Sequence, residues 1–428
     1  MSEKTPPTRD ITRLIQPQVR KLEAYHIDET ASRIKLDAME NPFPLPDDVR
    51  KEVAEAVSRT PINRYPDPSA KALKKAVTNM WGIEPDQMVI GNGSDELIQM
   101  LVIAFGGPVL IPSPTFAMYE LTARALGQDV VTLPLKNDFS LDADKLISKA
   151  KQSKARIIFL ACPNNPTGNR YPDEVVMKIV ESCNAAVVID EAYFSFSGRT
   201  LIRRMKDHPN MIILRTLSKI GLAGLRIGVL AAAPAVVAEL NKIRLPYNIN
   251  VLSQTMAAVA MERWDFLYQQ IQLLVSERQK LYHALTQVPG LTAYPSETNF
   301  ILFRTEKDAS GIHAKLKQAG ILIKNLNKLG PLQNCLRVTV GTPVENLEFV
   351  HALRKILDTT PKPKTTATKP NAAVPAPKPK TAAPKSKTAP ASAPKKPALR
   401  PKTAAPKVVP AAKAKQKAAA KAAGKKKR

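Results

Sequence analysis

The sequence predicts an α/β protein with a mostly parallel, seven-stranded sheet, a second, smaller α/β domain and a disordered basic C-terminal tail. The first observation is that short apolar runs alternate with amphipathic stretches between residues 45 and 261. This alternation is typical of a parallel sheet that is covered by helices on both faces. The second observation is an abrupt change in charge after Asp358. The seven runs expected to form strands are residues 88–91, 109–112, 130–134, 156–161, 186–190, 211–214 and 228–231.

The remaining elements follow in chain order. Helices are expected between the strands, for instance at residues 96–105, 116–127 and 173–182. A long helical stretch at 262–287 has no strand signal and is expected to leave the large domain. After it, a smaller α/β domain is predicted from apolar runs at 300–303, 321–324 and 335–340 and helices at 309–318 and 344–357. The expected domains are an N-terminal arm that is part of the small domain (1–44), a large domain (45–261), a linking helix with the small domain (262–358) and the tail (359–428).

The tail differs from the rest of the chain in composition. Residues 359–428 hold 20 of the 64 Lys and Arg residues, 13 of the 37 prolines, no acidic residue and no aromatic residue. Such a segment cannot bury enough apolar surface to offset its ordering entropy, so we expect it to be disordered. Its charge density would favour sequence-independent contact with nucleic acid or another polyanion, and the absence of aromatic residues disfavours single-strand recognition. The alternative is a solvated extension without a partner.

The cysteine content and the hydropathy pattern indicate a cytoplasmic protein. Cys162, Cys183 and Cys335 are scattered, odd in number and without metal-type spacing, which argues against a disulfide framework and predicts no metal site. The N-terminus lacks the apolar core of a signal peptide, and no uncharged apolar run approaches the length of a membrane span.

Polar side chains follow four of the predicted strands, at the edge where ligands of such sheets bind. Residues 215–226 read RTLSKIGLAGLR and place Lys219 between hydroxyls and an arginine. Residues 90–95 read IGNGSD, in which Ser94 is a good N-cap for a helix whose free amides could bind an anion. Each segment alone also fits an ordinary loop or a plain capped helix.

The other two strand ends carry an amide and a carboxylate. Residues 162–168 read CPNNPTG, a rigid turn that presents an asparagine amide. Residues 187–193 read VVIDEAY and place Asp190 at the end of an apolar strand, where an uncompensated carboxylate would be costly. A pyridinium nitrogen is a suitable partner for Asp190, and capping of the next helix is the alternative.

These motifs, in this order, resemble those of fold-type-I pyridoxal-phosphate aminotransferases. More narrowly, RYPDP (64–68), PTFAMY (114–119), SETNF (296–300) and LRVTVGT (336–342) resemble segments of the histidinol-phosphate aminotransferases. The resemblance covers residues 10–357 and does not reach the tail. It implies the transfer of an amino group from L-histidinol phosphate to 2-oxoglutarate, in L-histidine biosynthesis, by a homodimer that uses pyridoxal 5'-phosphate.

The resemblance also implies roles for individual residues. Lys219 would form a Schiff base with the cofactor and act as the base, and Asp190 would pair with the pyridinium nitrogen. Tyr193 and Asn165 would bond the phenolic oxygen of the cofactor, and Phe116 would stack on its ring. The residues expected at the cofactor phosphate are Ser94, Asp95, Thr216, Ser218, Arg226 and, from the neighbouring subunit, Tyr65.

Substrate contacts are expected from the small domain and the N-terminal segment. Arg337 would anchor the carboxylate of glutamate or 2-oxoglutarate, and the substrate phosphate is expected near Tyr25, Lys324 and Arg337. Two positions depart from the family pattern: Lys324 replaces a common arginine, and residues 39–42 read MENP where relatives often read NENP. The alternatives are an aromatic amino acid aminotransferase, a threonine-phosphate decarboxylase, and a nucleic-acid-binding protein whose aminotransferase domain is inactive.

Overall fold

The computed structural model describes residues 10–24 and 28–358. Two of the expectations above therefore lie outside the described residues: the disordered tail at 359–428 and the substrate contact of Tyr25. Within the described ranges, no helix is both long enough and apolar enough to cross a membrane. The three cysteines are all buried and free.

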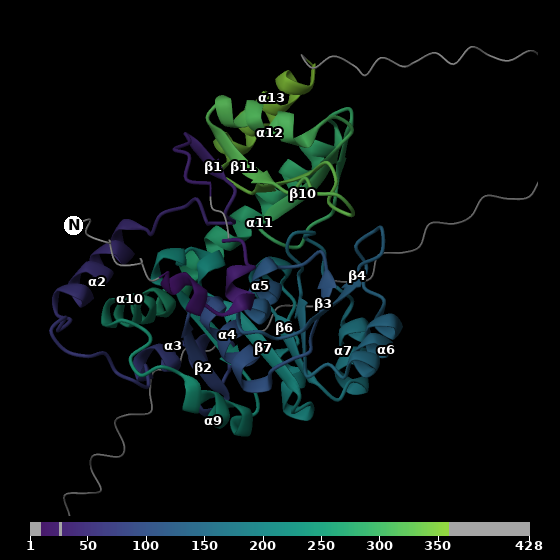
Figure 1. The fold of residues 1–428 in the computed structure, drawn as a ribbon. Helices are drawn as coiled ribbons and strands as arrows, with labels where there is room; N and C mark the ends of the chain where they lie inside the picture. The colour runs from purple at the N-terminus through teal and green to yellow at the C-terminus, as the bar shows by residue number, and fades with distance from the viewer. Residues whose placement is uncertain (1–9, 25–27, 359–428) are drawn as a thin grey trace, which may run out of the picture. The chain divides into compact units, whose positions relative to one another are not determined.

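The larger sheet has seven strands in the order β2-β8-β7-β6-β5-β3-β4 (Figure 1). Only the pairings of β8 with β2 and β7 are antiparallel, so the prediction of a mostly parallel sheet is confirmed. Each strand lies where an apolar run predicts one. Their bounds are β2 Met88–Asn92, β3 Val109–Ser113, β4 Val130–Pro134, β5 Ile157–Ala161, β6 Ala186–Asp190, β7 Met211–Thr216 and β8 Ile227–Ala231.

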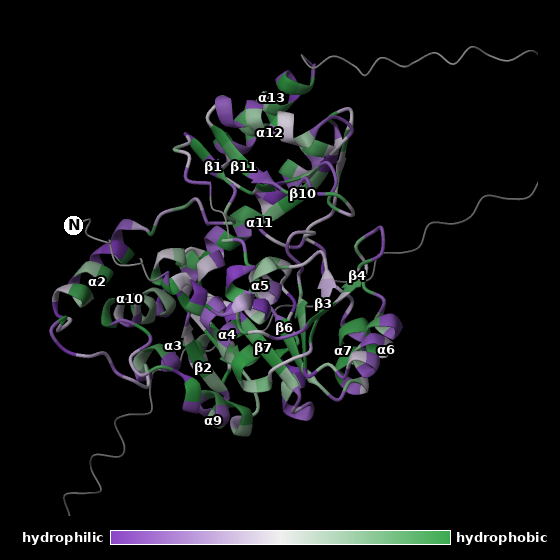
Figure 2. Ribbon diagram, viewed as in Figure 1, coloured by the Kyte–Doolittle hydropathy of each residue, from purple (hydrophilic) through white to green (hydrophobic). Residues whose placement is uncertain are grey.

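The central strands are apolar on both faces because each face meets a helical layer. In β5, Ile158 and Leu160 belong to one apolar cluster, and Ile157 and Phe159 belong to the other. The first cluster is covered by α3 (Lys71–Trp81), α6 (Ala143–Ser153) and α7 (Asp173–Ser182), and the second by α4 (Gly93–Phe105), α5 (Ala117–Ala125) and α9 (Pro234–Ile243). Figure 2 shows the hydrophobic strands β6 and β7 between helices of mixed hydropathy. This layering explains why the strands read as continuous apolar runs rather than as alternating ones.

A second sheet has five strands in the order β1-β11-β12-β10-β9. Its first strand comes from the N-terminal segment and pairs in parallel with β11, while the other pairings are antiparallel. The domain boundaries proposed from the sequence remain a prediction. The elements of this part are β1 Ile34–Leu36, β9 Leu291–Ala293, β10 Phe300–Thr305, β11 Ile321–Asn325, β12 Cys335–Thr339, α12 Ala309–Gln318 and α13 Pro343–Asp358.

The long helix predicted at 262–287 is confirmed as α11 (Trp264–Thr286). A helix that was not predicted, α10 (Val251–Glu262), precedes it, and the two helices meet at Arg263. The backbone of Arg263 leaves the helical region at φ −100° and ψ 44°. Its guanidinium forms ion pairs with Asp48 and Glu52 of α2 (Asp47–Ser58). These ion pairs tie α2 to the junction between α10 and α11.

Candidate active site

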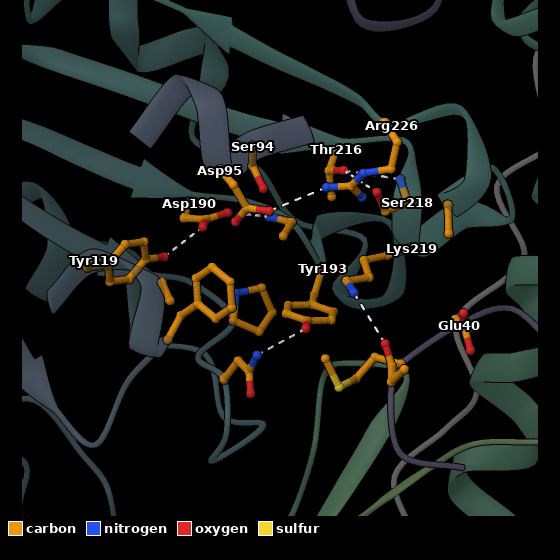
Figure 3. Close-up of a pocket in the computed structure, with 18 residues that line it drawn as sticks. Glu40, Ser94, Asp95, Tyr119, Asp190, Tyr193, Thr216, Ser218, Lys219 and Arg226 are labelled. Carbon is orange, nitrogen blue, oxygen red and sulfur yellow. Dashed lines mark hydrogen bonds and ion pairs between the residues drawn. The ribbon is translucent and has the colours of Figure 1, made fainter. Parts of the chain in front are cut away.

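A cavity of about 220 Å³ lies at the carboxyl ends of the strands of the larger sheet. Its walls come from the segments that follow β2, β3, β5, β6 and β7, together with residues 38–40 after β1. Figure 3 shows Lys219, Asp190, Tyr193 and Arg226 around this space. Ten of the residues predicted from the sequence to bind the cofactor line it: Ser94, Asp95, Phe116, Asn165, Asp190, Tyr193, Thr216, Ser218, Lys219 and Arg226.

Lys219 follows β7 in a short 3-10 helix, Ser218–Ile220. Its Nζ lies 3.5 Å from the carbonyl oxygen of Ala38. Burial lowers the pKa of Lys219 from 10.5 to about 8, and the positive charge of Arg337 adds to this effect. A larger fraction of the amine is therefore neutral near pH 7 than for an exposed lysine, and a neutral amine can act as a nucleophile or a base.

Asp190 ends β6 and is buried, with 5% of its surface exposed. Its Oδ1 accepts a hydrogen bond from the backbone N–H of Ala192 at 3.0 Å, and its Oδ2 accepts one from the hydroxyl of Tyr119 at 2.6 Å. Burial nevertheless raises the pKa of Asp190 to about 6. A carboxylate in this position would be stabilised by a cationic partner in the cavity.

Tyr119 is a site residue to which the sequence analysis gave no role. It is fully buried and lies one turn after Phe116, at the start of α5. An aromatic residue at this helical spacing is indistinguishable from an ordinary core residue in the sequence. The only available signal was its place in the PTFAMY motif.

A second group of polar atoms forms at the start of α4. The backbone N–H of Gly93 bonds the carbonyl oxygen of Arg226 at 2.7 Å, and the Arg226 guanidinium lies 3.4 Å from Asp95. The hydroxyls of Thr216 and Ser218 are 3.0 Å apart. Thr216, Ser218 and Arg226 together offer hydroxyl and guanidinium donors of the kind that bind phosphate.

The expectation that Ser94 caps α4 is wrong. The helix begins at Gly93 with Asn92 in the capping position, so Ser94 lies inside the first turn. Gly93 adopts a φ of 79°, which a residue with a side chain rarely does, so the chain reverses direction at Gly93 and Ser94 follows it in the first turn. The hydroxyl of Ser94 still lines the cavity.

The turn after β5 presents the predicted amide. The side chain of Asn165 donates a hydrogen bond to the Tyr193 hydroxyl at 3.3 Å. Its neighbour Asn164 fixes the turn by bonding the hydroxyl of Thr167 and the carbonyl oxygen of Pro114. The turn thus holds Asn165 and Tyr193 side by side on one wall of the cavity.

A buried ion pair supports the ends of β6 and β7 and was not predicted. Arg215 and Glu191 are joined at 2.8 Å and are each 2% exposed. Glu191 also accepts hydrogen bonds from Thr200 and from the backbone of Leu201. These two residues are the immediate neighbours of Thr216 and Asp190, so their pairing fixes the spacing of the two strand ends.

The remaining predicted residues lie outside the wall of the cavity. Arg337 donates hydrogen bonds to the Oδ1 of Asn165 and to the carbonyl oxygen of Asp37, and Lys324 is its cross-strand partner. Burial, followed by the charge of Arg337, lowers the pKa of Lys324. Tyr65 is 81% exposed and stacks on Tyr247 with ring centres 4.5 Å apart. The two cations therefore lie beside the cavity, whereas Tyr65 is not among the residues that line the cavity of its own chain.

A mostly parallel sheet with a buried lysine and a buried carboxylate at its strand ends agrees with the class of protein that the sequence motifs resemble, the aminotransferases. The profile of the family "Aminotransferase class I and II" matches residues 31–353, and the chain belongs to that family. It is 44% identical over 354 residues to histidinol-phosphate aminotransferase 2 of Nitrosococcus oceani, a match that covers 81% of this chain and 98% of the relative. It is 40% identical over 348 residues to the histidinol-phosphate aminotransferase of Aquifex aeolicus, with 80% and 98% covered. Within the family, the chain therefore belongs to the histidinol-phosphate aminotransferases.

Solved structures agree with this assignment. The crystal structure of histidinol-phosphate aminotransferase from Sinorhizobium meliloti, in complex with pyridoxal-5'-phosphate, matches with a TM-score of 0.74 and 26% identity. The match covers 80% of this chain and 97% of that one. L-threonine-O-3-phosphate decarboxylase from Porphyromonas gingivalis also matches, with a TM-score of 0.67 over 76% and 99% of the two chains. At 23% identity, this second likeness shows a shared fold alone.

Proposed function

We propose that this protein transfers the amino group of L-histidinol phosphate to 2-oxoglutarate, giving imidazole acetol phosphate and glutamate, in L-histidine biosynthesis. The observation that carries the proposal is the placing of Lys219 and Asp190 in one cavity of a chain that matches histidinol-phosphate aminotransferases over almost their full length. The aromatic aminotransferase, the decarboxylase and an inactive aminotransferase domain are less favoured, because the relatives reported above at 40% identity or more are histidinol-phosphate aminotransferases.

The cavity fits pyridoxal 5'-phosphate. Lys219 supplies a buried amine for the aldehyde, Asp190 a buried carboxylate for the ring nitrogen, and Phe116 an apolar face for the ring. Ser94, Asp95, Thr216, Ser218 and Arg226 would hold the phosphate, and Tyr193 and Asn165 the phenolic oxygen. The bound cofactor supplies an electron-accepting ring that makes a proton on the substrate carbon acidic.

Lys219 and Asp190 would act on two different protons. The Nζ of Lys219 would carry the proton from the substrate Cα to the cofactor carbon, because its lowered pKa leaves part of the amine neutral near pH 7. Asp190 would keep the ring nitrogen protonated, since a carboxylate beside it favours the charged form of the ring. Tyr193 would orient the cofactor with Asn165, to which it is bonded.

The backbone of Gly228 packs closely against the start of α4, where the cofactor phosphate would bind. This contact allows a test of how the cofactor fits the cavity. A Cβ built on Gly228 lies 2.5 Å from the carbonyl carbon of Gly93 and 2.6 Å from the amide nitrogen of Ser94. We expect Gly228→Ala to displace the first turn of α4, to lower the free energy of unfolding by about 1–3 kcal/mol and to weaken cofactor binding. Denaturant unfolding and cofactor titration measure the two effects. Gly224→Ala is the control, because no described atom beyond Gly224 and its two chain neighbours lies within 4 Å of the added Cβ. Equal effects in both variants would contradict the packing argument.

Substrate discrimination would depend on Arg337 and Lys324. Arg337 would bind the carboxylate of the second substrate, and Lys324, with Tyr25, would join it at the substrate phosphate. The test is kcat/KM for L-histidinol phosphate against phenylalanine and tyrosine, each with 2-oxoglutarate. We expect a preference of several orders of magnitude for histidinol phosphate. Comparable values would indicate an aromatic aminotransferase, and release of CO2 from threonine phosphate would indicate a decarboxylase.

A homodimer in the cytoplasm completes the proposal. Tyr65 is largely exposed and stacks on Tyr247, so both rings are accessible to a second copy of the chain. Tyr65 would then contact the cofactor phosphate of the neighbouring subunit. Sedimentation analysis tests the dimer, and loss of cofactor affinity in Tyr65→Ala without loss of the dimer tests the role of the residue.

The basic tail supports a second, separate proposal. Residues 359–428 carry 20 basic and no acidic residues, a composition that favours contact with duplex nucleic acid by release of counterions. Deletion of this segment should abolish duplex DNA binding at low salt and leave transamination unchanged. Equal DNA binding by the full chain and the truncated chain would refute the proposal.

A further inference from the structure

We infer that Tyr119 is a positioning residue that holds the Asp190 carboxylate in place, and in its ionised form, for the ring nitrogen of the cofactor. The inference rests on the proposed cofactor and adds a residue to which the sequence motifs give no role. It starts from one contact, the 2.6 Å hydrogen bond from the Tyr119 hydroxyl to Oδ2 of Asp190. Figure 3 shows the two side chains facing one another at one end of the cavity.

The carboxylate of Asp190 is fixed from two sides. The backbone N–H of Ala192 bonds Oδ1 at 3.0 Å, and the Tyr119 hydroxyl bonds Oδ2. The two donors together set the plane of the carboxylate, because rotation about its last torsion would break both bonds. Each oxygen retains acceptor capacity for a further donor in the cavity, since a carboxylate oxygen can accept two hydrogen bonds.

The ring of Tyr119 is itself held by two aromatic neighbours. It stacks on Phe159 of β5 with ring centres 4.7 Å apart, and it meets Phe116 edge-on at 5.5 Å. Phe116 lines the cavity, where it would stack on the cofactor ring. One segment, residues 116–119, therefore positions both the face contact of the cofactor and the carboxylate at its ring nitrogen.

The groups around Asp190 act in opposite directions on the pKa of its carboxyl. Burial and the nearby charge of Asp95 raise the pKa of Asp190, whereas the hydrogen bonds from Tyr119 and Ala192 and the charge of Lys219 lower it. The hydrogen bond from Tyr119 is the largest of the opposing effects. Burial and the charge of Asp190 raise the pKa of Tyr119 well above its ordinary value, so the phenol stays a donor. Without this hydroxyl, Asp190 would become more basic and would compete with the ring nitrogen for the proton.

The experiment is Tyr119→Phe in the enzyme loaded with pyridoxal phosphate that carries 15N at the ring nitrogen. We expect the 15N resonance to move towards that of an unprotonated pyridine, because the proton shifts towards Asp190. We also expect kcat to fall roughly 10- to 100-fold, the range for loss of a hydrogen bond to a charged group, with KM changed much less. The ring and its stacking on Phe159 are retained, and thermal unfolding verifies that the fold is kept.

Tyr171→Phe is the matched control. Tyr171 is also buried, and its hydroxyl has no hydrogen-bond partner among residues 10–24 and 28–358. This control should leave the 15N resonance and kcat unchanged. An unchanged 15N resonance in Tyr119→Phe would overturn the inference and leave Tyr119 as core packing. If the wild type bound the cofactor but did not transaminate histidinol phosphate, the proposed substrate would be wrong, and the 15N resonance would still decide the role of Tyr119.

Discussion

Replacing Lys219 with methionine is expected to lower the rate of transamination by roughly 10^4-fold or more, because the proposed covalent anchor and the base are lost together. Methionine has a similar length and no charge, so the cavity keeps its shape. The measurement is steady-state turnover of histidinol phosphate, together with the visible absorbance of the covalently held cofactor. A variant that retained a few per cent of the wild-type activity would contradict the role of Lys219.

The same substitution is expected to stabilise the cofactor-free protein. The pKa of Lys219 falls from 10.5 to about 8 on folding, so the folded protein binds this proton less tightly than the unfolded chain does. The resulting destabilisation is complete below pH 8 and disappears as the pH rises through 10.5. Methionine removes it, and we expect a gain on the order of 3 kcal/mol at pH 7 and none near pH 11. Denaturant unfolding at both pH values tests whether the substitution stabilises the protein at pH 7 and not near pH 11.

Lys242→Met is the control for both measurements. Lys242 lies on α9, is exposed and pairs with Glu239, three residues earlier. It is not among the residues that line the cavity. Its substitution should leave turnover unchanged and should produce no comparable gain in stability at pH 7, because an exposed ion pair contributes little.

The sequence could predict the part of the site that lies on parallel strands. Buried parallel strands are continuous apolar runs, and the polar residue that ends such a run, as Asp190 ends β6, is conspicuous. Lys219 was found in the same way, after β7. The rule that strand ends meet at one edge then brings these residues together without any knowledge of their distances.

Contacts between distant segments could not be predicted in this way. Tyr119 and Asp190 are 71 residues apart, and Arg337 and Asn165 are 172 apart. Their pairing depends on how α5 and the second sheet pack, and no local pattern encodes that. Arg263, at the junction of α10 and α11, is likewise held by ion pairs to a helix more than 200 residues earlier, and no local pattern encodes that contact.

Asp190→Asn is expected to lower transamination by roughly 10^2- to 10^3-fold, because an amide cannot stabilise a cationic ring nitrogen as a carboxylate does. The stability of the cofactor-free protein should increase, although the activity falls. The pKa of Asp190 rises from 3.8 to about 6 on folding, so the folded state loses stability as the pH rises from about 4 to 6 and does not recover it above. Asparagine is neutral throughout, so the variant should gain up to about 3 kcal/mol at pH 8 and nothing below pH 4.

Asp138→Asn is a control of opposite sign. Asp138 is exposed, and hydrogen bonds from Ser140 lower its pKa, so its ionised form favours the folded state. Its substitution should slightly destabilise the protein at pH 8 and leave transamination unchanged. Addition of pyridoxal phosphate separates the two aspartates further. The ring cation offsets the buried charge of Asp190, so the cofactor should stabilise the wild type and Asp138→Asn more than Asp190→Asn. Equal stabilisation of all three proteins by the cofactor would mean that Asp190 does not face the ring nitrogen.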